Sequence, residues 1–388
     1  MVEWKKLGDI MSIVRGASPR PIQDFITTGD GVNWIKIGDV SIGDKYITKT
    51  NERITKEGAK KSRHLHPGDF ILSNSMSFGR PYILKIDGCI HDGWIAMSDY
   101  EKTVISGYLY EVLNSNFVQD YWKQKANNGG AMSNLNSDIV RETEIPVPTI
   151  SEQARIVGVL DTFTSSIENL NLQIAERRKQ YEYYRDQLLD LEGKDGVEMK
   201  TLGEIGKCVA GATPSTKEKL YWDNGNIPWM SSGEVHQGLV SHTASYITKL
   251  GYDNSSTKML PIGTVVIALA GQGKTRGSAA ITAIELCTNQ SLCGVVIENK
   301  SILNKYVYYY LRTRYNDLRR ISSGEGTRGG LNLKMIGSYP VPIVSIDEQS
   351  RIVSILDTFE ASISNLEAQL SQREKQYEYY RNKLLTFD

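Results

Sequence analysis

The chain contains an internal repeat, and this repeat constrains the fold more than any other feature. Residues 152–189 (EQARIVGVLDTFTSSIENLNLQIAERRKQYEYYRDQLL) match residues 348–385 (EQSRIVSILDTFEASISNLEAQLSQREKQYEYYRNKLL) at a constant offset of 196. The segments that precede them match more faintly, as in VEWKKLGDI at 2–10 and VEMKTLGEI at 197–205. Such a repeat predicts the order domain–helix–domain–helix, in which the helices are nearly copied and the domains have diverged.

The repeat also sets the expected domain boundaries. We expect a first variable domain at 1–148, a first helical segment at 149–193, a second variable domain at 194–343 and a second helical segment at 344–388. Each variable domain combines short β-like runs with one long amphipathic helix, near Tyr108–Lys125 in the first copy and near Leu303–Arg320 in the second. This mixture predicts α/β (α+β) domains. Because the two copies keep their helices and vary their domains, we expect the helices to serve as a common attachment and the domains to serve in recognition.

Composition narrows the class of protein. The length of 388 residues fits two or three folded units. The 45 basic residues balance 45 acidic ones, so net charge gives no overall argument for nucleic acid, although residues 197–345 alone carry 16 basic against 10 acidic groups. No apolar run is long enough for a membrane helix, and MVEWKKLGDI lacks the apolar core of a signal peptide. The four cysteines form no CxxC pair, so we expect reduced thiols in a cytoplasmic protein.

The helical segments carry the heptad pattern of a coiled coil. Their apolar positions are separated by alternating steps of four and three residues, interrupted only by Arg177 and Arg373. The second variable domain lies between the end of one helix and the start of the other. An antiparallel pair brings these ends together, whereas a parallel pair would force the domain to span roughly 60 Å. We therefore expect two long antiparallel helices with the domains at opposite ends. The predicted seam residues are Ile156, Leu160, Phe163, Ile167, Leu170, Tyr181, Tyr184, Ile352, Leu356, Phe359, Ile363, Leu366, Tyr377 and Tyr380.

One segment resembles a phosphate-binding loop. Residues 268–275 read ALAGQGKT, but the motif requires glycine where Ala268 stands. The first copy has Ser77-Phe78-Gly79-Arg80 at the matching place, without the Lys-Ser/Thr pair. We therefore do not expect a working P-loop, and a Gly-Lys or Gly-Arg turn aimed at a nucleic-acid phosphate fits better. The histidines and cysteines show no zinc-ligand spacing, and no catalytic set stands out, so we predict no metal site and no catalytic residue.

Basic residues near glycine and polar residues are the best candidates for contacts with DNA, because they hold phosphates at any sequence and arginine also reads guanine. A solvated surface is the alternative for any run of charges, and partly accounts for Arg312, Arg314, Arg319 and Arg320 on the predicted second-domain helix. The candidate DNA-binding residues are Arg80, Lys274, Arg276, Arg328, Lys60, Lys61 and Arg63.

The full chain resembles the specificity (S) subunits of type I restriction-modification systems. The resemblance is carried by the duplicated layout, the Pro-x-Pro…Glu-Gln-x-Arg-Ile start of each helix, the Lys-Gln-Tyr-Glu-Tyr-Tyr-Arg helix end and the Gly-Lys turn. It implies that each variable domain is a target recognition domain for one half of a bipartite DNA site, which we expect to be asymmetric because the two domains differ widely. It further implies that this subunit is not catalytic, and that its helices fix the spacer and dock two methyltransferase (M) subunits. Restriction (R) subunits would then join. S-adenosylmethionine, ATP and Mg²⁺ are expected in these partners, with adenine as the methylated base, and no cofactor is expected in this chain.

Docking of a partner needs helix surface outside the seam. Candidate positions that recur in both helices are Val157, Tyr183, Val353 and Tyr379, and packing against this chain's own domains is the alternative for them.

Three other functions remain open at this stage. A specificity subunit for a fused restriction–methyltransferase polypeptide would look almost the same and differs only in its partner. A coiled-coil adaptor for protein or glycan would lack salt-dependent DNA binding. A P-loop nucleotidase would turn over ATP as the isolated chain.

Overall fold

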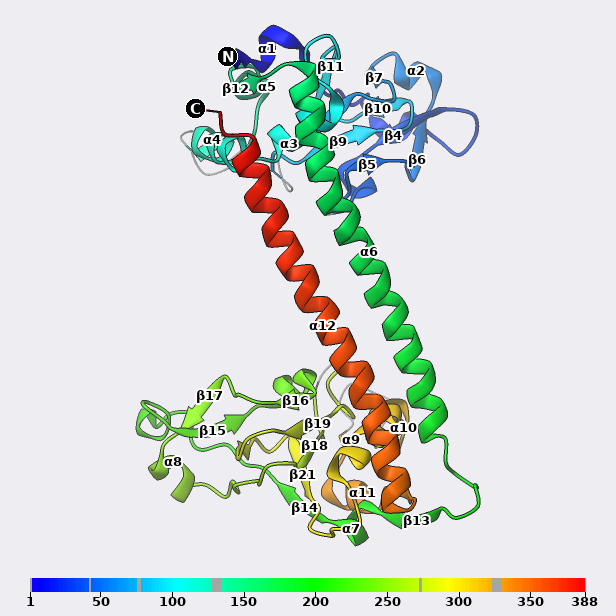
Figure 1. Cartoon of the computed structure of the whole chain (residues 1–388), viewed down its shortest axis with the longest axis vertical. Helices are drawn as coiled ribbons and strands as arrows, with labels where there is room; N and C mark the ends of the chain where they lie inside the picture. Colours follow the sequence, from blue (N-terminus) through cyan, green and yellow to red (C-terminus); the bar gives the residue numbers. More distant parts are fainter. Residues whose placement is uncertain are drawn as a thin grey trace. The chain divides into compact units, whose positions relative to one another are not determined.

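The chain folds into two compact units, each built around one of the two diverged domains. The computed structural model describes residues 2–41, 43–74, 78–127, 134–271, 274–322 and 330–387. The first unit comprises Met1–Asn171 with Ala368–Asp388, and the second comprises Leu172–Glu367. Each unit therefore contains one domain, the start of one long helix and the end of the other (Figure 1).

The first unit contains two five-stranded sheets and a short strand pair. The first sheet has the order β2 (Ser12–Arg15), β11 (Trp94–Ser98), β8 (Phe70–Ser73), β9 (Pro81–Leu84) and β5 (Tyr46–Ile47). The second has the order β3 (Ile26–Thr27), β6 (Glu52–Ile54), β4 (Val32–Ile35), β10 (Gly88–Ile90) and β7 (Arg63–Leu65). The pair is β1 (Glu3–Lys6) with β12 (Glu144–Val147). The helices are α1 (Leu7–Ile10), α2 (Lys56–Ala59), α3 (Ser106–Leu113), α4 (Asn116–Asn127), α5 (Ser137–Arg141) and the start of α6 (Ile150–Leu189).

The second unit repeats this design. Its five-stranded sheet has the order β14 (Lys207–Ala210), β21 (Leu292–Val296), β18 (Val265–Ala268), β19 (Ala279–Thr282) and β16 (Leu239–Val240). A three-stranded sheet has the order β17 (Ser245–Ile247), β15 (Ile227–Met230) and β20 (Cys287–Thr288), and β13 (Glu198–Thr201) pairs with β22 (Pro340–Ile343). The helices are α7 (Leu202–Ile205), α8 (Lys249–Asp253), α9 (Asn304–Thr313), α10 (Tyr315–Ile321), α11 (Leu333–Gly337) and the start of α12 (Ile346–Leu384).

The central strands of each domain are buried on both faces. In β8, Phe70 and Leu72 pack with α3 and the start of α6, whereas Ile71 packs with residues of the second sheet such as Ile35. The same alternation places Val265 and Ile267 of β18 toward α9, and Val266 toward the smaller sheet. Because side chains alternate across a strand, each domain is a helix layer, a central sheet and a second sheet. The predicted α/β duplication is therefore confirmed.

The predicted long helix of each domain is wrong, because both are broken in two. The first ends at Leu113 and restarts at Asn116. Asn114 donates its side-chain amide to the Tyr110 carbonyl, and Ser115 donates its hydroxyl to the Val112 carbonyl. Such side chains compete with the helical backbone and favour helix ends. The second helix breaks at Arg314, where φ is −97° and ψ is 15°.

Within each unit the two long helices run antiparallel, as predicted. In the first unit Phe163 stacks on Tyr380, with ring centroids 5.3 Å apart. In the second unit Tyr184 stacks on Phe359, with ring centroids 5.5 Å apart. Both pairs are the same contact, because the offset of 196 relates Phe163 to Phe359 and Tyr184 to Tyr380. The placement of the domains at opposite ends of the helices stays a prediction. No helix among the described residues is long and apolar enough to cross a membrane.

The Glu-Gln-x-Arg-Ile sequence at each helix start has a structural explanation. Gln153 is fully buried, accepts a hydrogen bond from the Ile105 amide and donates to the carbonyls of Thr103 and Pro148. Gln349 makes the same three bonds, with the Leu303 amide and the carbonyls of Ser301 and Val344. One amide side chain thus satisfies three backbone groups and ties the helix to its own domain.

Replacing Gln153 with Leu should destabilise the first unit by about 3 kcal/mol or more. Each buried polar group left without a partner costs about 1–3 kcal/mol, and this change leaves three of them. Urea denaturation followed by tryptophan fluorescence measures the effect, since four of the six tryptophans lie in the first unit. Gln187→Leu, at an exposed position of α6, is the control and should change stability little. A loss below 1 kcal/mol for Gln153→Leu would contradict this role.

Candidate nucleic-acid interface

The turn that joins the two central strands carries candidate residues in both domains, namely Arg80 in the first and Lys274 and Arg276 in the second. In the first domain eight residues (73–80) separate the paired Leu72 and Pro81. In the second domain eleven residues (268–278) separate the paired Ile267 and Ala279. The second turn is therefore three residues longer.

The strand register corrects one equivalence inferred from the sequence. Counting back from Pro81 and Ala279 aligns Gly79-Arg80 with Gly277-Ser278, not with Gly273-Lys274. Both Gly79 (φ 69°) and Gly277 (φ 83°) adopt the left-handed backbone conformation that favours glycine. The equivalence inferred from the sequence paired two glycine-basic dipeptides and did not allow for the longer turn of the second domain. The P-loop-like dipeptide Gln272-Gly273 lies outside the described residues.

The candidates of these turns differ in exposure. Lys274 is exposed, and its backbone carbonyl accepts hydrogen bonds from the hydroxyls of Tyr315 (2.9 Å) and Ser278 (3.3 Å). Arg80 is half-buried. Arg276 is only 8% exposed, so its side chain lies inside the second domain. Exposure thus favours Arg80 and Lys274 over Arg276 as phosphate contacts. The candidate Arg328 lies outside the described residues.

A second basic group follows α2 in the first domain. Thr55 caps this helix by accepting a hydrogen bond from the Gly58 amide, and the chain then passes through Lys60 and Lys61 into β7. Lys60, Lys61 and Arg63 are all exposed. The ammonium of Lys61 lies 4.6 Å from the ring centroid of Phe25, a cation–π contact. This short segment presents three positive charges to solvent.

Three of the arginines on or between α9 and α10 form ion pairs, and of these Arg320 is also solvated, with 78% of its side chain exposed. Arg312 pairs with Glu360 of α12, Arg314 lies 3.2 Å from Glu192, and Arg320 lies 2.5 Å from Asp317. The sequence pattern could not show this, because two of the three acids are distant in the chain.

Sequence reasoning also missed a cleft of about 500 Å³ in the first domain. Its lining includes Trp34, His91, Asp92, Arg20 and the ion pair of Lys36 with Glu52. Burial acts to raise the pKa of Asp92, but hydrogen bonds from Ser18 and Arg20 and the charge of His91 outweigh it and hold that pKa below its usual range. Burial lowers the pKa of His91, although the neighbouring charge of Asp92 acts to raise it.

Trp34 has a counterpart in the second domain. Trp34 pairs with Cys89 and Trp229 pairs with Cys287, in parallel strand pairs of the same register. Burial raises the pKa of both thiols to about 11, so these cysteines are inert parts of the core. The matching tryptophans were the one sequence signal for this shared region.

The domains hold the long helices through a tyrosine of the repeat. In the second unit the Tyr181 hydroxyl donates to Glu360 (3.0 Å) and accepts from Arg312 (3.1 Å). The Tyr309 hydroxyl lies within hydrogen-bonding distance of the carboxylates of Asp357 (2.6 Å) and Glu360 (3.0 Å), and it can donate its one hydrogen to either.

In the first unit the equivalent Tyr377 donates to Glu111 of α3 (2.7 Å). Glu111 is 1% exposed, and burial raises the pKa of its carboxyl. The carboxylate that accepts from the repeated tyrosine therefore belongs to the domain in the first unit (Glu111) and to the long helix α12 in the second (Glu360).

The predicted seam residues differ in burial: some are buried, four of them fully within the domain cores, and the others are more accessible to solvent. Ile156 and Leu160 are fully buried in the core of the first domain, and Ile352 and Leu356 in that of the second. Tyr181 is 6% exposed and Leu170 is 9% exposed. Tyr184, Tyr377, Tyr380, Phe163, Ile167, Phe359, Ile363 and Leu366 are more accessible than these.

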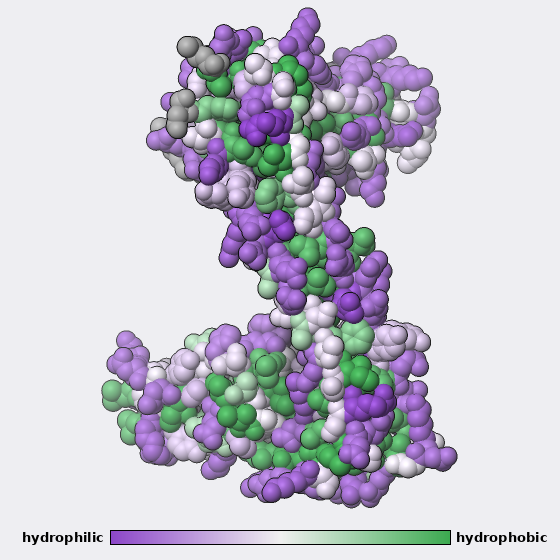
Figure 2. Space-filling view, viewed as in Figure 1, coloured by the Kyte–Doolittle hydropathy of each residue, from purple (hydrophilic) through white to green (hydrophobic). Residues whose placement is uncertain are grey.

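The predicted docking residues also differ in burial, because the two valines pack against domain cores and the two tyrosines are exposed. Val157 and Val353 pack against the cores of their own domains, which is the alternative considered for them. Tyr183 and Tyr379 are 62% and 57% exposed. Figure 2 shows hydrophobic and hydrophilic residues interspersed along the surface of the helical segments.

The comparisons with known proteins all find type I restriction specificity proteins. The family model described as the type I restriction modification DNA specificity domain matches residues 1–177 and 194–374. The chain is 35% identical over 410 residues to the specificity subunit of type I restriction enzyme EcoR124I/EcoR124II from Escherichia coli, with 100% of this chain and 94% of the relative covered. It is 25% identical over 411 residues to a putative type I restriction enzyme specificity subunit from Haemophilus influenzae, with 100% and 96% covered.

Two solved structures share the fold. One is a chain from a study of complex assembly and conformational transition of the type I restriction-modification system, with a TM-score of 0.70 at 17% identity, covering 99% of this chain and 96% of that one. The other is the HsdS subunit from Thermoanaerobacter tengcongensis, with a TM-score of 0.56 at 16% identity and the same coverage.

The duplicated α/β domains, each with a basic turn and each seated on a copied helix, define a two-domain DNA-recognition protein. The chain belongs to the family of type I restriction modification DNA specificity domains and carries two copies of that domain. It is a specificity subunit that recognises DNA sequence. The nucleotidase, the adaptor and the subunit of a fused polypeptide are not favoured.

Replacing Glu111 with Gln should make the first unit relatively more stable as pH rises. The folded-state pKa of Glu111 is raised above the ordinary 4.5, so its favourable contribution is complete below pH 4.5 and is lost as pH rises through the folded pKa. Glutamine keeps an acceptor for Tyr377 without the buried charge. Unfolding free energies across this range measure the difference, with the exposed Glu101→Gln as control. A constant difference between Glu111→Gln and the unaltered chain would show that Glu111 does not titrate in this way.

Proposed function

We propose that each domain reads one half of a bipartite, asymmetric site in double-stranded DNA, and that the paired helices set the spacer. This proposal rests on one observation: both domains have the same architecture, but the turn between their central strands differs in length. Sheet order, glutamine anchor and helix stacking recur in both units, whereas the turn between the central strands differs by three residues. Two linked readers gain affinity because the second binding event becomes intramolecular.

The partners and their chemistry belong to the same proposal. The chain contributes no catalysis; two methyltransferase subunits dock on the helical segments through surfaces that include Tyr183 and Tyr379. Restriction subunits complete the assembly. S-adenosylmethionine, ATP and Mg²⁺ act in these partners, adenine is the methylated base, and the complex works in the cytoplasm. Support comes from the strong exposure of both tyrosines and from the similar fold of a chain whose study concerns complex assembly of the type I restriction-modification system.

Replacing Lys274 with Ala should weaken DNA binding of the assembled complex about equally at all sequences. Loss of one phosphate contact lowers the slope of log affinity against log salt by about 0.9. Fluorescence anisotropy with a labelled duplex over a salt series gives this slope. Lys194→Ala, an exposed lysine between α6 and β13, is the matched control and should leave the slope unchanged. An unaltered slope for Lys274→Ala would remove this residue from the interface.

Inserting one heptad into both long helices should change the spacer and leave both half-sites unchanged. Seven helical residues add ~10 Å, which corresponds to about three base pairs of B-DNA. Binding is lost if the rotation that accompanies the insertion is not tolerated. Sequencing of the methylated motif in cells that express the variant with its methyltransferase gives half-sites and spacer together. A methylated motif with the original spacer would contradict the role of the helices as a ruler.

A further inference from the structure

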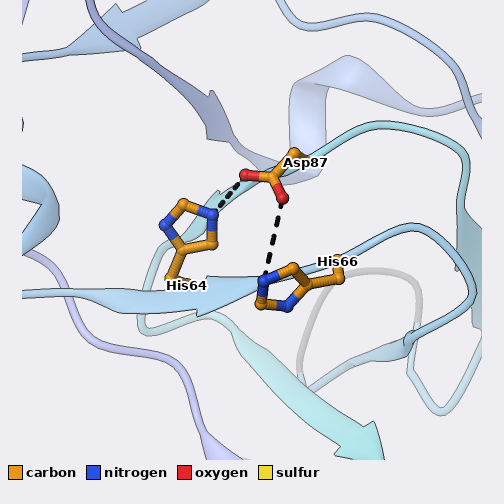
Figure 3. A group of neighbouring side chains, drawn as sticks. All are labelled: His64, His66 and Asp87. Carbon is orange, nitrogen blue, oxygen red and sulfur yellow. Dashed lines mark hydrogen bonds and ion pairs between the residues drawn. The ribbon is translucent and has the colours of Figure 1, made fainter.

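We propose that His64, His66 and Asp87 of the first domain form a binding site for one transition-metal cation of the Zn²⁺ class. Each side chain offers one ligand atom, and these atoms all lie within 4.8 Å of one another. Figure 3 shows both imidazoles directed toward the carboxylate of Asp87.

The strand register brings the three side chains together. His64 belongs to β7, and His66 follows directly after Leu65, the last residue of that strand, so in an extended chain both side chains point to the same side. In the antiparallel partner β10, Gly88 lies opposite Leu65 and Cys89 lies opposite His64. One further step places Asp87 opposite His66. The pairing of β7 with β10 therefore brings the three side chains together, with His64 inside the strand pair and His66 and Asp87 immediately beyond it.

The spacing of the ligand atoms suits a tetrahedral cation. His66 Nε2 lies 3.9 Å from Asp87 Oδ2, wider than a hydrogen bond, whereas His64 Nε2 contacts Asp87 Oδ1 directly. Metal–nitrogen and metal–oxygen distances near 2.1 Å separate two tetrahedral ligands by roughly 3.4 Å. The observed pairs lie on either side of this value. His66 is 72% exposed, so its ring can adjust without disturbing the core.

The donor set selects the kind of cation. Imidazole nitrogens suit Zn²⁺, Co²⁺ and Ni²⁺ better than Mg²⁺ or Ca²⁺, which prefer oxygen ligands. Two histidines and one carboxylate leave the fourth position to water. Cys89 is fully buried, and its sulfur lies 3.9 Å from His64 Nδ1, the ring nitrogen opposite the one that contacts Asp87. It therefore lies behind His64, where the thiol orients the ring, and is not a ligand.

The second domain does not repeat this site. Cys89 and Cys287 hold the same register position, and the bridge of Leu260 with Leu286 corresponds to that of Leu65 with Gly88. The counterparts of His64, His66 and Asp87 are therefore Met259, Pro261 and Glu285. One cation per chain is expected, and it links β7, the last strand of its sheet, to β10.

Titration of the metal-free full chain with Co²⁺ tests the proposal, using protein that carries no histidine tag. We expect one Co²⁺ per chain with a visible ligand-field band, displaced by Zn²⁺. His66→Asn should weaken the affinity at least about 10-fold, because loss of even an outer-shell partner has effects of that size. Zn²⁺ should also slow hydrogen exchange of the β7 and β10 amides in the unaltered chain.

Two controls keep the result interpretable. His242→Asn removes an exposed histidine of the second domain and should leave Co²⁺ binding unchanged. Asp87→Asn keeps the size of the side chain and should weaken Co²⁺ binding as His66→Asn does. Absence of stoichiometric Co²⁺ binding would overturn the proposal, as would equal affinities of the unaltered chain and His66→Asn.

Discussion

One buried amide at the start of each long helix is the constraint on which the rest of the structure depends. Gln153 joins the loop before α3 to the end of β12, and Gln349 does the same before α9 and after β22. The amide has both donor and acceptor groups, so no apolar residue can replace it and no carboxylate can donate to the two carbonyls. The direction in which each helix leaves its domain is fixed by these bonds. A spacing carried by the helices has meaning only if this direction is fixed.

The second attachment, through the repeated tyrosine, is built differently in the two units. Tyr377 donates to Glu111, an acid of the first domain, whereas Tyr181 donates to Glu360, an acid of the helix that Arg312 of the second domain neutralises. The first helix has Thr164 where the second has Glu360. A copied helix surface thus accepts two diverged domains because each domain supplies the group that its helix lacks. Exchange of one domain for the other would leave a buried acid without its partner or a tyrosine without its acceptor, so the domains are less interchangeable than the repeat suggests.

The sequence predicted what local periodicity and self-comparison contain. The antiparallel helices followed from heptad spacing and from connectivity, and the stacking of Phe163 on Tyr380 agrees with both. The predicted long domain helices failed at Asn114 and Ser115, because side-chain bonds to the preceding turn overrode an amphipathic pattern. The sequence did not predict the cluster of His64, His66 and Asp87, because Asp87 is distant in the chain and reaches the two histidines only through strand pairing. Partners of Arg312 and Arg314 were invisible for the same reason, since both lie far away in the chain.

The turns between the central strands, residues 73–80 and 268–278, differ in length on a shared frame. Gly79 and Gly277 hold the same left-handed corner before the second central strand. The residue before each glycine is an inward-facing anchor: Phe78 packs against the core of the first domain, and Arg276 is 8% exposed in the second. A basic residue is therefore not a DNA contact by charge alone, because its position relative to the glycine decides whether it faces the core or solvent. In the longer turn Lys274 precedes this anchor by two residues and is exposed. Because Phe78 and Arg276 hold the core side of the glycine corner, exposed positions such as Lys274 can differ between the domains without disturbing the packing below.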